Sequence, residues 1–536
     1  MKYILSLFIV AGFYGYAEAQ PERLLYHDIK TDRAGKIIPW FSELPGVAYN
    51  HVINLVWSFW DTMRTDMNGL PYYMNHQVWH PDVNDRRGIG GDQLQMALSS
   101  WRLLYQYTGN ERIKENMKFI ADYYITHGMS SPDARWPRIP YPYNTLVYSG
   151  YYDGDMVIGK GFTQPDKAGS LGIELINLYK ITGTSGHGQT PMSVYLKTAV
   201  KIANTLAQYT TDGDENNSPL PFKVNALTGE PGLLLSNTGD NRKTQLSTYT
   251  TNWAGTMELF LELIKMNEGD IALYQSAFDK ILAWMKKYPL ANNKWGPFFE
   301  DVPGWSDTQI NAVTFAQFIM NHREYFPDWK NNVKSIFNWV YKTLGNSKWE
   351  KYGVVVINEQ TAYMAPGNSH TARQASAELQ YIMLTGDTTG KENAIHQLNW
   401  ATYMVNNDGK NRYLNDDVWL TDGYGDYVRH YLRAMAAMPE LAMNGENHIL
   451  YSSSVVQNVE YNKRPGKGVM MRYTSYDRAG TEKVYLTERP SKILVEQKEI
   501  FENKDIAGEG FTWVPLNKGG VLTINRLNGN NVAVAK

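Results

Sequence analysis

The chain of 536 residues contains no cysteine and carries almost no net charge. Without cysteine it can form no disulfide bond, no thiolate nucleophile and no cysteine-ligated zinc site. Its 52 basic and 54 acidic residues give a formal charge of −2, which provides no electrostatic case for binding nucleic acid or an anionic membrane surface. The sequence also lacks H-E-x-x-H and G-x-S-x-G, and GIGGDQ follows no predicted strand. It therefore predicts neither a metal nor a cofactor.

Long hydrophobic runs are missing as well, apart from the first residues. After these, no run reaches about 18 apolar residues, so we expect no membrane-spanning helix. The start, MKYILSLFIVAGFYGYAEAQ, has a basic Lys2, an apolar segment and an A-x-A site ending at Ala19. We expect residues 1–19 to be a signal peptide that is cleaved after Ala19. Because an exported chain without disulfides is typical of bacteria, we expect a periplasmic or secreted protein.

Helical periodicity covers most of residues 45–440, where apolar residues recur at i, i+3, i+4 and i+7. One kind of helix has a single apolar stripe, as in NNVKSIFNWVYKTLGN, and we expect these outer helices to begin near Val47, Glu111, Ser193, Asp270, Lys330 and Lys391. The other kind is apolar nearly all round and has small residues in its first turn. We expect these inner helices to begin near Gly90, Lys167, Tyr249, Thr308, Thr371 and Asp422.

The two kinds of helix alternate along the chain, six of each, as in a repeat array. Turns from inner to outer helices are short, whereas the connections from outer to inner helices are long. All the long loops should therefore lie on one face, together with the N-termini of the inner helices and their unpaired N–H groups. We predict an (α/α)6 toroid over residues 20–444; an open α-solenoid is the alternative, and it would not need this asymmetry of the loops. Alternating and β-branched segments predict a small β-sandwich over residues 445–536, which we interpret as a stabilising appendage, with carbohydrate binding as the alternative.

Two segments, GGDQLQMALSSWRLLYQYTG and YYDGDMVIGKGFTQPDKAG, resemble the six-hairpin (α/α)6 glycosidases. The similarity is greatest to the unsaturated glucuronyl hydrolases and the related bacterial β-glucuronidases, and it covers most of residues 40–440. The resemblance implies an enzyme that acts on uronic acids. It also implies two catalytic aspartates on the active face, about one hairpin apart, which fits Asp92 and a second aspartate at Asp153 or Asp155.

Cleavage of a glycosidic bond needs an acid that protonates the leaving oxygen and a carboxylate that activates water or attacks the anomeric carbon. Asp92 opens an inner helix after two glycines, which let the backbone approach a ligand closely. Asp153 and Asp155 lie in the next long loop. The alternative roles are a helix cap for Asp92 and turn positions for the other two. We predict Asp92 and one of Asp153 and Asp155 as the catalytic carboxylates.

A uronic acid carries a carboxylate, which arginine, histidine or exposed helix N–H groups can bind. Such groups gather on the same predicted face, together with aromatic side chains that could stack on sugars and polar residues at helix starts. Solvated loops, helix caps and ordinary packing are the alternative explanations for each of them. The predicted substrate-binding residues are His76, Trp79, His80, Arg86, Arg87, Tyr148, Tyr152, Asp166, His370, Arg373 and Asp422. Glu174, Glu258 and Glu378 lie deeper in the inner helices and are predicted to be structural.

These observations predict an exported glycoside hydrolase, of the β-glucuronidase type, that removes glucuronic acid or a related uronic acid from complex glycans. One alternative is a polysaccharide lyase in which a tyrosine or histidine is the base. The other is a glycan-binding protein without catalytic activity. The expected partner is an oligosaccharide or polysaccharide that contains uronic acid. The sequence leaves the linkage, the stereochemical outcome and the oligomeric state open, with a homodimer as one option.

Overall fold

The computed structural model describes residues 24–65, 68–75, 90–146, 149–155, 158–183, 193–234, 246–298, 305–411, 423–462, 468–503 and 508–536, without the side chains of residues 90–93 and 423–424. The predicted signal peptide lies outside these residues, so its cleavage stays a prediction. None of the helices within the described ranges has the length and apolar character that a bilayer span requires.

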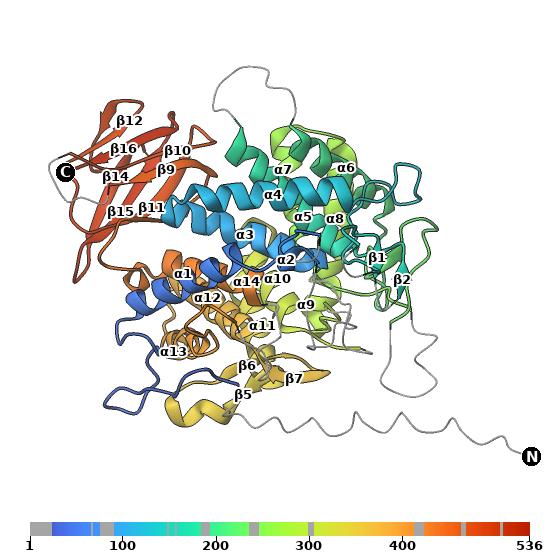
Figure 1. Cartoon of the computed structure of the whole chain (residues 1–536), viewed down its shortest axis with the longest axis horizontal. Helices are drawn as coiled ribbons and strands as arrows, with labels where there is room; N and C mark the ends of the chain where they lie inside the picture. Colours follow the sequence, from blue (N-terminus) through green and yellow to red (C-terminus); the bar gives the residue numbers. More distant parts are fainter. Residues whose placement is uncertain are drawn as a thin grey trace, which may run out of the picture.

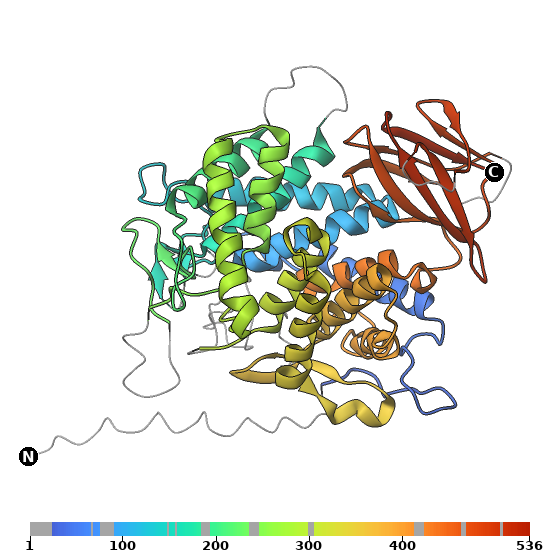
Figure 2. The same cartoon turned by 180° about the vertical axis from the view of Figure 1, so that it is seen from behind.

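Twelve long helices in the described part of the chain alternate between an outer and an inner position. The outer helices are α1 (Pro45–Asp61), α4 (Glu111–His127), α6 (Val194–Tyr209), α8 (Ile271–Lys287), α11 (Trp329–Leu344) and α13 (Lys391–Thr402). The inner helices are α3 (Gly90–Thr108), α5 (Pro165–Thr182), α7 (Ala254–Met266), α10 (Gln309–Asn321), α12 (Asn368–Thr385) and α14 (Gly423–Ala437). Two short helices, α2 (Tyr72–Asn75) and α9 (Pro289–Asn292), lie in the connections. Figures 1 and 2 show this body of helices from two sides.

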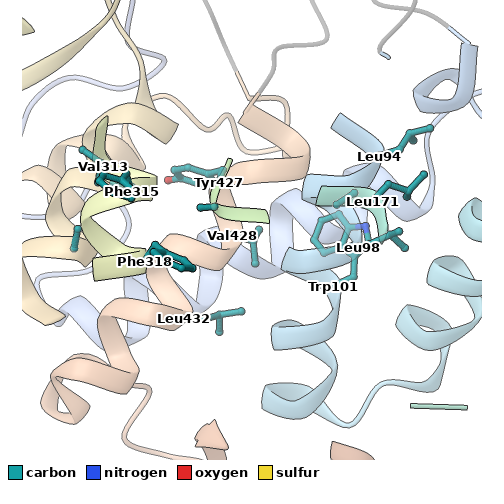
Figure 3. Close-up of a cluster of buried hydrophobic side chains, with 14 of the residues drawn as sticks. Leu94, Leu98, Trp101, Leu171, Val313, Phe315, Phe318, Tyr427, Val428 and Leu432 are labelled. Atoms are coloured by element: carbon teal, nitrogen blue, oxygen red, sulfur yellow. The ribbon is translucent and has the colours of Figure 1, made fainter. Parts of the chain in front are cut away.

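The inner helices form a closed ring. Helix α14 packs between α12 and α3, α3 contacts α5, and α5 contacts α7, while α10 contacts both α12 and α7. The first outer helix, α1, packs against α13 and α14 from the other end of the chain. Figure 3 shows buried side chains of α3, α5, α10 and α14 gathered between the helices. Because the last inner helix contacts the first, the ring is closed, and the open α-solenoid is excluded.

The predicted helix starts agree with the structure to within a few residues, and α7 differs most, beginning at Ala254 where we expected Tyr249. The residues before it lie outside the helix, and their side chains form hydrogen bonds to another segment. The hydroxyl of Thr250 donates to the carbonyl of Pro297 at 2.8 Å, and that of Thr251 donates to the carbonyl of Trp295 at 2.6 Å. Because of these tertiary contacts the helix begins later in the chain than predicted, and the apolar pattern alone contains no sign of them.

Small residues allow α5 and α7 to approach closely. A Cβ atom added at Gly169 would lie 2.7 Å from the Cβ atom of Thr256, and one at Gly255 would lie 2.9 Å from the Cα atom of Ser170. Both distances are too short for real carbon contacts. The first turns of these two inner helices therefore need glycine where the helices meet, as their small-residue composition predicted.

Gly169→Val should destabilise the protein by about 3 kcal/mol, because the added methyl groups force α5 and α7 apart and overpack the ring. Urea unfolding of both proteins measures the difference. Gly445→Val is the matched control, since a Cβ atom there meets nothing closer than the end of the Met443 side chain, at 3.4 Å. Equal stability of the Gly169→Val variant and the wild type would contradict the close packing.

The long connections from outer to inner helices carry three small antiparallel sheets. In one connection β1 (Gly154–Asp155) pairs with β2 (Gly159–Lys160). Strand β3 (Phe162–Thr163) pairs with β4 (Val224–Asn225) of the next connection, and the third sheet is formed by β5 (Gly345–Asn346), β6 (Val356–Gln360) and β7 (Tyr363–Pro366). These sheets give the long loops a defined backbone next to the inner helices.

The C-terminal part consists of two antiparallel sheets that share one hydrophobic core, an arrangement typical of a β-sandwich. One sheet has the order β13-β12-β16-β10-β9 and the other β14-β15-β11-β8. The strands are β8 (His448–Ser452), β9 (Val456–Tyr461), β10 (Val469–Ser475), β11 (Gly480–Leu486), β12 (Lys492–Val495), β13 (Lys498–Ile500), β14 (Gly510–Pro515), β15 (Gly520–Arg526) and β16 (Asn531–Ala535). The boundary at residue 444 stays a prediction.

The two sheets pack on the C-terminal ends of inner helices (Figure 1). His448 of β8 stacks on Tyr107 near the end of α3, with the ring centroids 3.8 Å apart. The side-chain amide of Gln457 donates to the carbonyl of Lys180, at 2.8 Å, and to that of Gly183, at 2.5 Å. These bonds satisfy carbonyl groups that the end of α5 leaves without helical partners. The sandwich thus covers the helix ends and also supplies hydrogen-bond donors to their free carbonyl groups.

Glu378 is a buried acid on the outward side of α12. Its carboxylate accepts a hydrogen bond from the side-chain amide of Gln374 at 2.7 Å, and it lies close to Tyr341 of α11. Burial raises the pKa of Glu378 from 4.5 to about 7. This position agrees with the structural role that its depth in the helix predicted.

Glu378→Gln should make the protein more stable at alkaline pH. Since the folded state holds a proton on Glu378 between pH 4.5 and about 7 and the unfolded state does not, stability falls as the pH rises through this window. The amide cannot ionise, so the variant should gain up to about 3 kcal/mol over the wild type at pH 8 and little at pH 4.5. Urea unfolding at several pH values tests this. The control is Glu392→Gln, at an exposed position of α13; a gain independent of pH at position 378 would refute the explanation.

Candidate active site

The N-terminal ends of the inner helices lie together at the end of the ring that faces away from the sandwich. The C-terminal ends of α3, α5 and α12 all contact the sandwich, through Tyr107, Gly183 and Met383 respectively. Helices α7 and α10 run in the same direction, because Gly169 meets Thr256 near both helix starts and Gln309 contacts Arg373 near both helix starts. We call this end of the ring the N-terminal rim.

The first cluster at the N-terminal rim is centred on Arg373 of α12. Its guanidinium donates from Nη1 to Oε1 of Gln309 at 2.6 Å and from Nη2 to the carboxylate of Asp426, at the start of α14. The Nε atom of Arg373 is buried and has no hydrogen-bond partner in the described part of the chain. Arg373 is 1% exposed, and burial lowers its pKa to about 10, so it is a desolvated cation at neutral pH.

Asp426 is shared among several partners. Its carboxylate pairs with Arg373 and with Arg429 one turn further on, and it lies 3.1 Å from Nε2 of His430. Burial opposes ionisation, but the two guanidinium groups outweigh it and keep the pKa of Asp426 well below its usual range. Burial also lowers the pKa of His430 to about 3, so its ring is neutral. One carboxylate therefore balances two arginines here.

His370 stands next to this cluster in the first turn of α12. Its Nδ1 lies 3.2 Å from Nη1 of Arg373, and its Nε2 lies 3.8 Å from a carboxylate oxygen of Glu359, in β6. The side chain is buried. The ring thus lies between a cation and an anion, and because a guanidinium can only donate hydrogen bonds, Nδ1 is the acceptor and Nε2 faces Glu359.

A second cluster joins the starts of α5 and α7. The ammonium group of Lys167 lies 2.8 Å from Oδ2 of Asp166, which also accepts a hydrogen bond from the side-chain amide of Asn252 at 2.9 Å. Asp166 is completely buried and is the second residue of α5, and it forms no capping bond, although its place before the apolar run also suggested a helix cap. Lys167 lies 3.6 Å from the ring centroid of Phe298. The pair is part of the wall of the ring.

Asp153 and Asp155 lie on the same loop but differ in exposure. Oδ1 of Asp153 accepts hydrogen bonds from the amide and hydroxyl of Thr145, and Oδ2 lies 3.3 Å from the ammonium of Lys160; 26% of the Asp153 side chain is exposed. Asp155 is 1% exposed and pairs with Lys223, which is 2% exposed. Of the two aspartates, Asp153 is the one that solvent and ligands can reach.

This loop lies at the same end of the molecule as the start of α3 (Figure 1). The hydroxyl of Tyr152 donates to the carbonyl of Met74 in α2, and α2 contacts α3. Residues 92 and 153–155 thus share one end, as a joint catalytic role requires. Tyr152 itself is 3% exposed, so its ring belongs to the packing under the loop and has no open face for a sugar.

Eight of the predicted residues lie wholly or partly outside the described part of the chain. Asp92 is the third residue of α3, but its side chain is not described. His76, Trp79, His80, Arg86, Arg87, Tyr148 and Asp422 lie outside the described residues. Within the described ranges, no three side chains of histidine, aspartate or glutamate come together in a way that could hold a metal ion.

Partners of the predicted residues were missed by the sequence reasoning. Asp166 pairs with Lys167 and Asn252. Arg373 pairs with Gln309, and Asp155 pairs with Lys223. Three of these four polar side chains lie in or near the first turn of an inner helix, where we expected mainly small residues. Polar residues at the start of an otherwise apolar helix are the sequence feature that could have predicted these partners.

A cavity of about 740 Å³ lies inside the ring and is lined by all six inner helices. Its rim end includes Asn252, Phe298 and Arg373. Met96, Phe298 and Ile310 form a small apolar cluster there, and each is less than 5% exposed. Glu174 and Glu258, predicted to be structural, are also part of the cavity wall.

No family model matches the sequence, and no curated protein matches it. Solved structures are similar to it. A cellobiose 2-epimerase from Bacillus thermoamylovorans B4167 is 15% identical with a TM-score of 0.50, over 71% of this chain and 97% of that chain. A sugar epimerase from a ruminal bacterium is 12% identical with a TM-score of 0.51, over 73% and 98%. An unsaturated glucuronyl hydrolase specific for heparin is 11% identical with a TM-score of 0.45, over 75% and 100%. The first two similarities confirm the (α/α)6 fold that the resemblance implied.

Proposed function

We propose that the chain is a glycoside hydrolase that removes glucuronic acid, or a related uronic acid, from complex glycans. The observation that carries the proposal is the convergence of α3, α5, α12 and α14 at the N-terminal rim, where Asp92 begins one helix and the desolvated guanidinium of Arg373 lies on another. A carboxylate for catalysis and a cation for the uronate are the two elements that the reaction needs. The similar solved structures named above are, by their names, enzymes of sugars.

The roles follow from exposure and charge. Asp92 is our first catalytic carboxylate, and Asp153 is the second, since its carboxylate is partly exposed while that of Asp155 is buried against Lys223. Arg373 is almost fully buried, but unlike Tyr152 and Asp155 it lines the cavity, and its Nε has no hydrogen-bond partner in the described part of the chain, which suits it to bind the uronate carboxylate at the rim end of that cavity. Asp155 and Lys223 would hold the loop that carries Asp153 in place.

A proton-transfer reaction, as in a lyase or an epimerase, is the second candidate. The position of His370, between Glu359 and Arg373, favours it, because a ring oriented by an anion and next to a cation can exchange a proton with a carbon beside a carboxylate or carbonyl. Asp92 would then be dispensable for turnover.

The experiment is incubation of the purified protein with uronate-containing oligosaccharides and with an aryl β-glucuronide. Release of free glucuronic acid, without ultraviolet absorbance from an unsaturated product, supports the hydrolase. An unsaturated product identifies a lyase, and a changed sugar configuration by NMR with no bond cleavage identifies an epimerase. Binding of the oligosaccharides without any product would leave a glycan-binding protein as the function and overturn the proposal.

A further inference from the structure

The cavity inside the ring extends well below the N-terminal rim. At depth it is lined by Arg102 of α3, Glu174 of α5, Gln317 of α10, and Arg429 and Arg433 of α14. At its far end it reaches Tyr451 and Ser452 of β8 and Lys483 of β11, in the sandwich. Its volume, about 740 Å³, falls in the range of pockets that hold small-molecule ligands. We call the part below Arg373 the lumen.

The lumen opens at the sandwich end. Four of the lining residues there, Asn321, Arg323, Met383 and Tyr451, are exposed. At the rim end, in contrast, the lining residues Met96, Phe298 and Ile310 are buried in one apolar cluster. A ligand can therefore reach the lumen from the face opposite the candidate active site.

The charges in the lumen do not balance. Below Arg373, five of the lining residues are arginine or lysine and three are glutamate, and each glutamate already has a partner. Glu174 lies 3.4 Å from Arg102, Glu258 lies 2.8 Å from His322, and Glu262 lies 2.5 Å from Lys180. At the top of the lumen, Arg373 and Arg429 share the single carboxylate of Asp426. Positive charge is thus left in excess along the wall.

Arg433 is the centre of this excess. Within the described ranges its only hydrogen bond is from Nη1 to Oε1 of Gln317, at 3.3 Å, and no carboxylate lies within 4 Å of it. Arg429 is one turn away on the same face of α14, and burial together with this neighbouring guanidinium lowers the pKa of Arg433 to about 9. A partly desolvated guanidinium beside a like charge is unfavourable unless an anion is present.

Neutral hydrogen-bonding groups surround the arginines. The amide side chains of Gln106, Asn177 and Gln317 line the lumen, alongside the apolar Leu103, Ile173 and Phe318. Amides suit hydroxyl groups, and the apolar surfaces suit the carbon faces of a ring. The wall is therefore matched to a hydroxylated organic anion better than to a bare hydrocarbon.

We propose that the lumen is a second binding site, separate from the N-terminal rim, that takes a small hydroxylated anion such as a sugar acid from the sandwich side. Its carboxylate or sulfate group lies against Arg429 and Arg433, and its hydroxyl groups contact the amides of the wall. The sandwich, through Tyr451 and Lys483, forms part of the entrance and so contributes to binding as well as to stability.

The test is isothermal titration of the whole protein with sodium glucuronate, sodium sulfate and, as a neutral analogue, glucose. We expect saturable binding of glucuronate and at least a tenfold weaker affinity in Arg433→Met. Arg112→Met, at a side chain that is 65% exposed on α4, is the matched control and should bind as the wild type does. Binding of glucuronate at the rim should be unchanged in Arg433→Met. The difference between the titrations of the wild type and Arg433→Met therefore reports binding in the lumen alone, and the measurement does not require turnover.

Tighter binding of glucuronate than of sulfate supports a sugar acid as the ligand, whereas equal affinities that both fall in Arg433→Met support the site with any oxyanion as its ligand. Met383→Trp narrows the entrance at an exposed position and should slow association measured by stopped flow, even if Arg433→Met failed to fold. Unchanged affinity in Arg433→Met, or glucose binding as tightly as glucuronate, would overturn the proposal.

Discussion

Asp92→Asn should lower kcat/KM for release of glucuronic acid by a factor of about 10² to 10⁴, the usual contribution of a general acid or base. The amide keeps the size of the side chain but can neither give nor take the proton at the glycosidic oxygen. Stability should change little, because asparagine suits the start of a helix as well as aspartate does. Initial rates over a range of substrate concentrations, together with a melting curve, measure both quantities.

Asp279→Asn is the control for the chemistry of the substitution, since Asp279 is exposed on the outer helix α8. Its rates should equal those of the wild type. If Asp92→Asn retained wild-type kcat/KM, Asp92 would be removed from the mechanism, and the proton-transfer reaction centred on His370 would become the better explanation.

Asp155→Asn should cost about 3–5 kcal/mol of stability, because it leaves the buried ammonium of Lys223 without its carboxylate. Asp153→Asn should cost less than about 1 kcal/mol, since its partner Lys160 is 75% exposed and water replaces the lost charge. The rate per folded molecule should show the opposite order. Asp153→Asn should lower it more than Asp155→Asn does, because Asp153 is the proposed catalytic residue. Urea unfolding and rates normalised to folded protein separate the two effects.

A double variant, Asp155→Asn with Lys223→Met, tests the cause of the destabilisation. Removing both charges leaves no uncompensated ion, so the double variant should be more stable than Asp155→Asn alone. If it were less stable, the buried pair would not explain the loss. If Asp155→Asn were as stable as the wild type but inactive, the roles of the two aspartates would have to be exchanged.

The ring could be predicted from the sequence because its signals are local. Apolar residues at helical spacing mark each helix, and the contrast between one stripe and a helix apolar all round separates outer from inner positions. The starts of α4 at Glu111, α13 at Lys391 and α3 at Gly90 coincide with the prediction. Where tertiary hydrogen bonds intervened, before α7, the prediction was five residues early.

The candidate site was predictable only in outline. Its place at the starts of the inner helices followed from loop lengths, and it brought Asp166, His370 and Arg373 to one rim. The pairing of side chains did not follow, because partners such as Arg373 and Asp426, or Asp155 and Lys223, are 53 and 68 residues apart. No pattern in the sequence distinguished the exposed Asp153 from the buried Asp155 two residues away.

The sequence by itself determined the number, order and sidedness of the helices and the change to strands near residue 444, since hydrophobic periodicity acts within a few turns of chain. Only the tertiary structure decided which acids are neutralised, which arginine has no carboxylate partner among the described residues, and on which face the lumen opens. Those outcomes depend on distances of a few ångströms between helices, and electrostatic free energies change steeply over such distances in a desolvated interior.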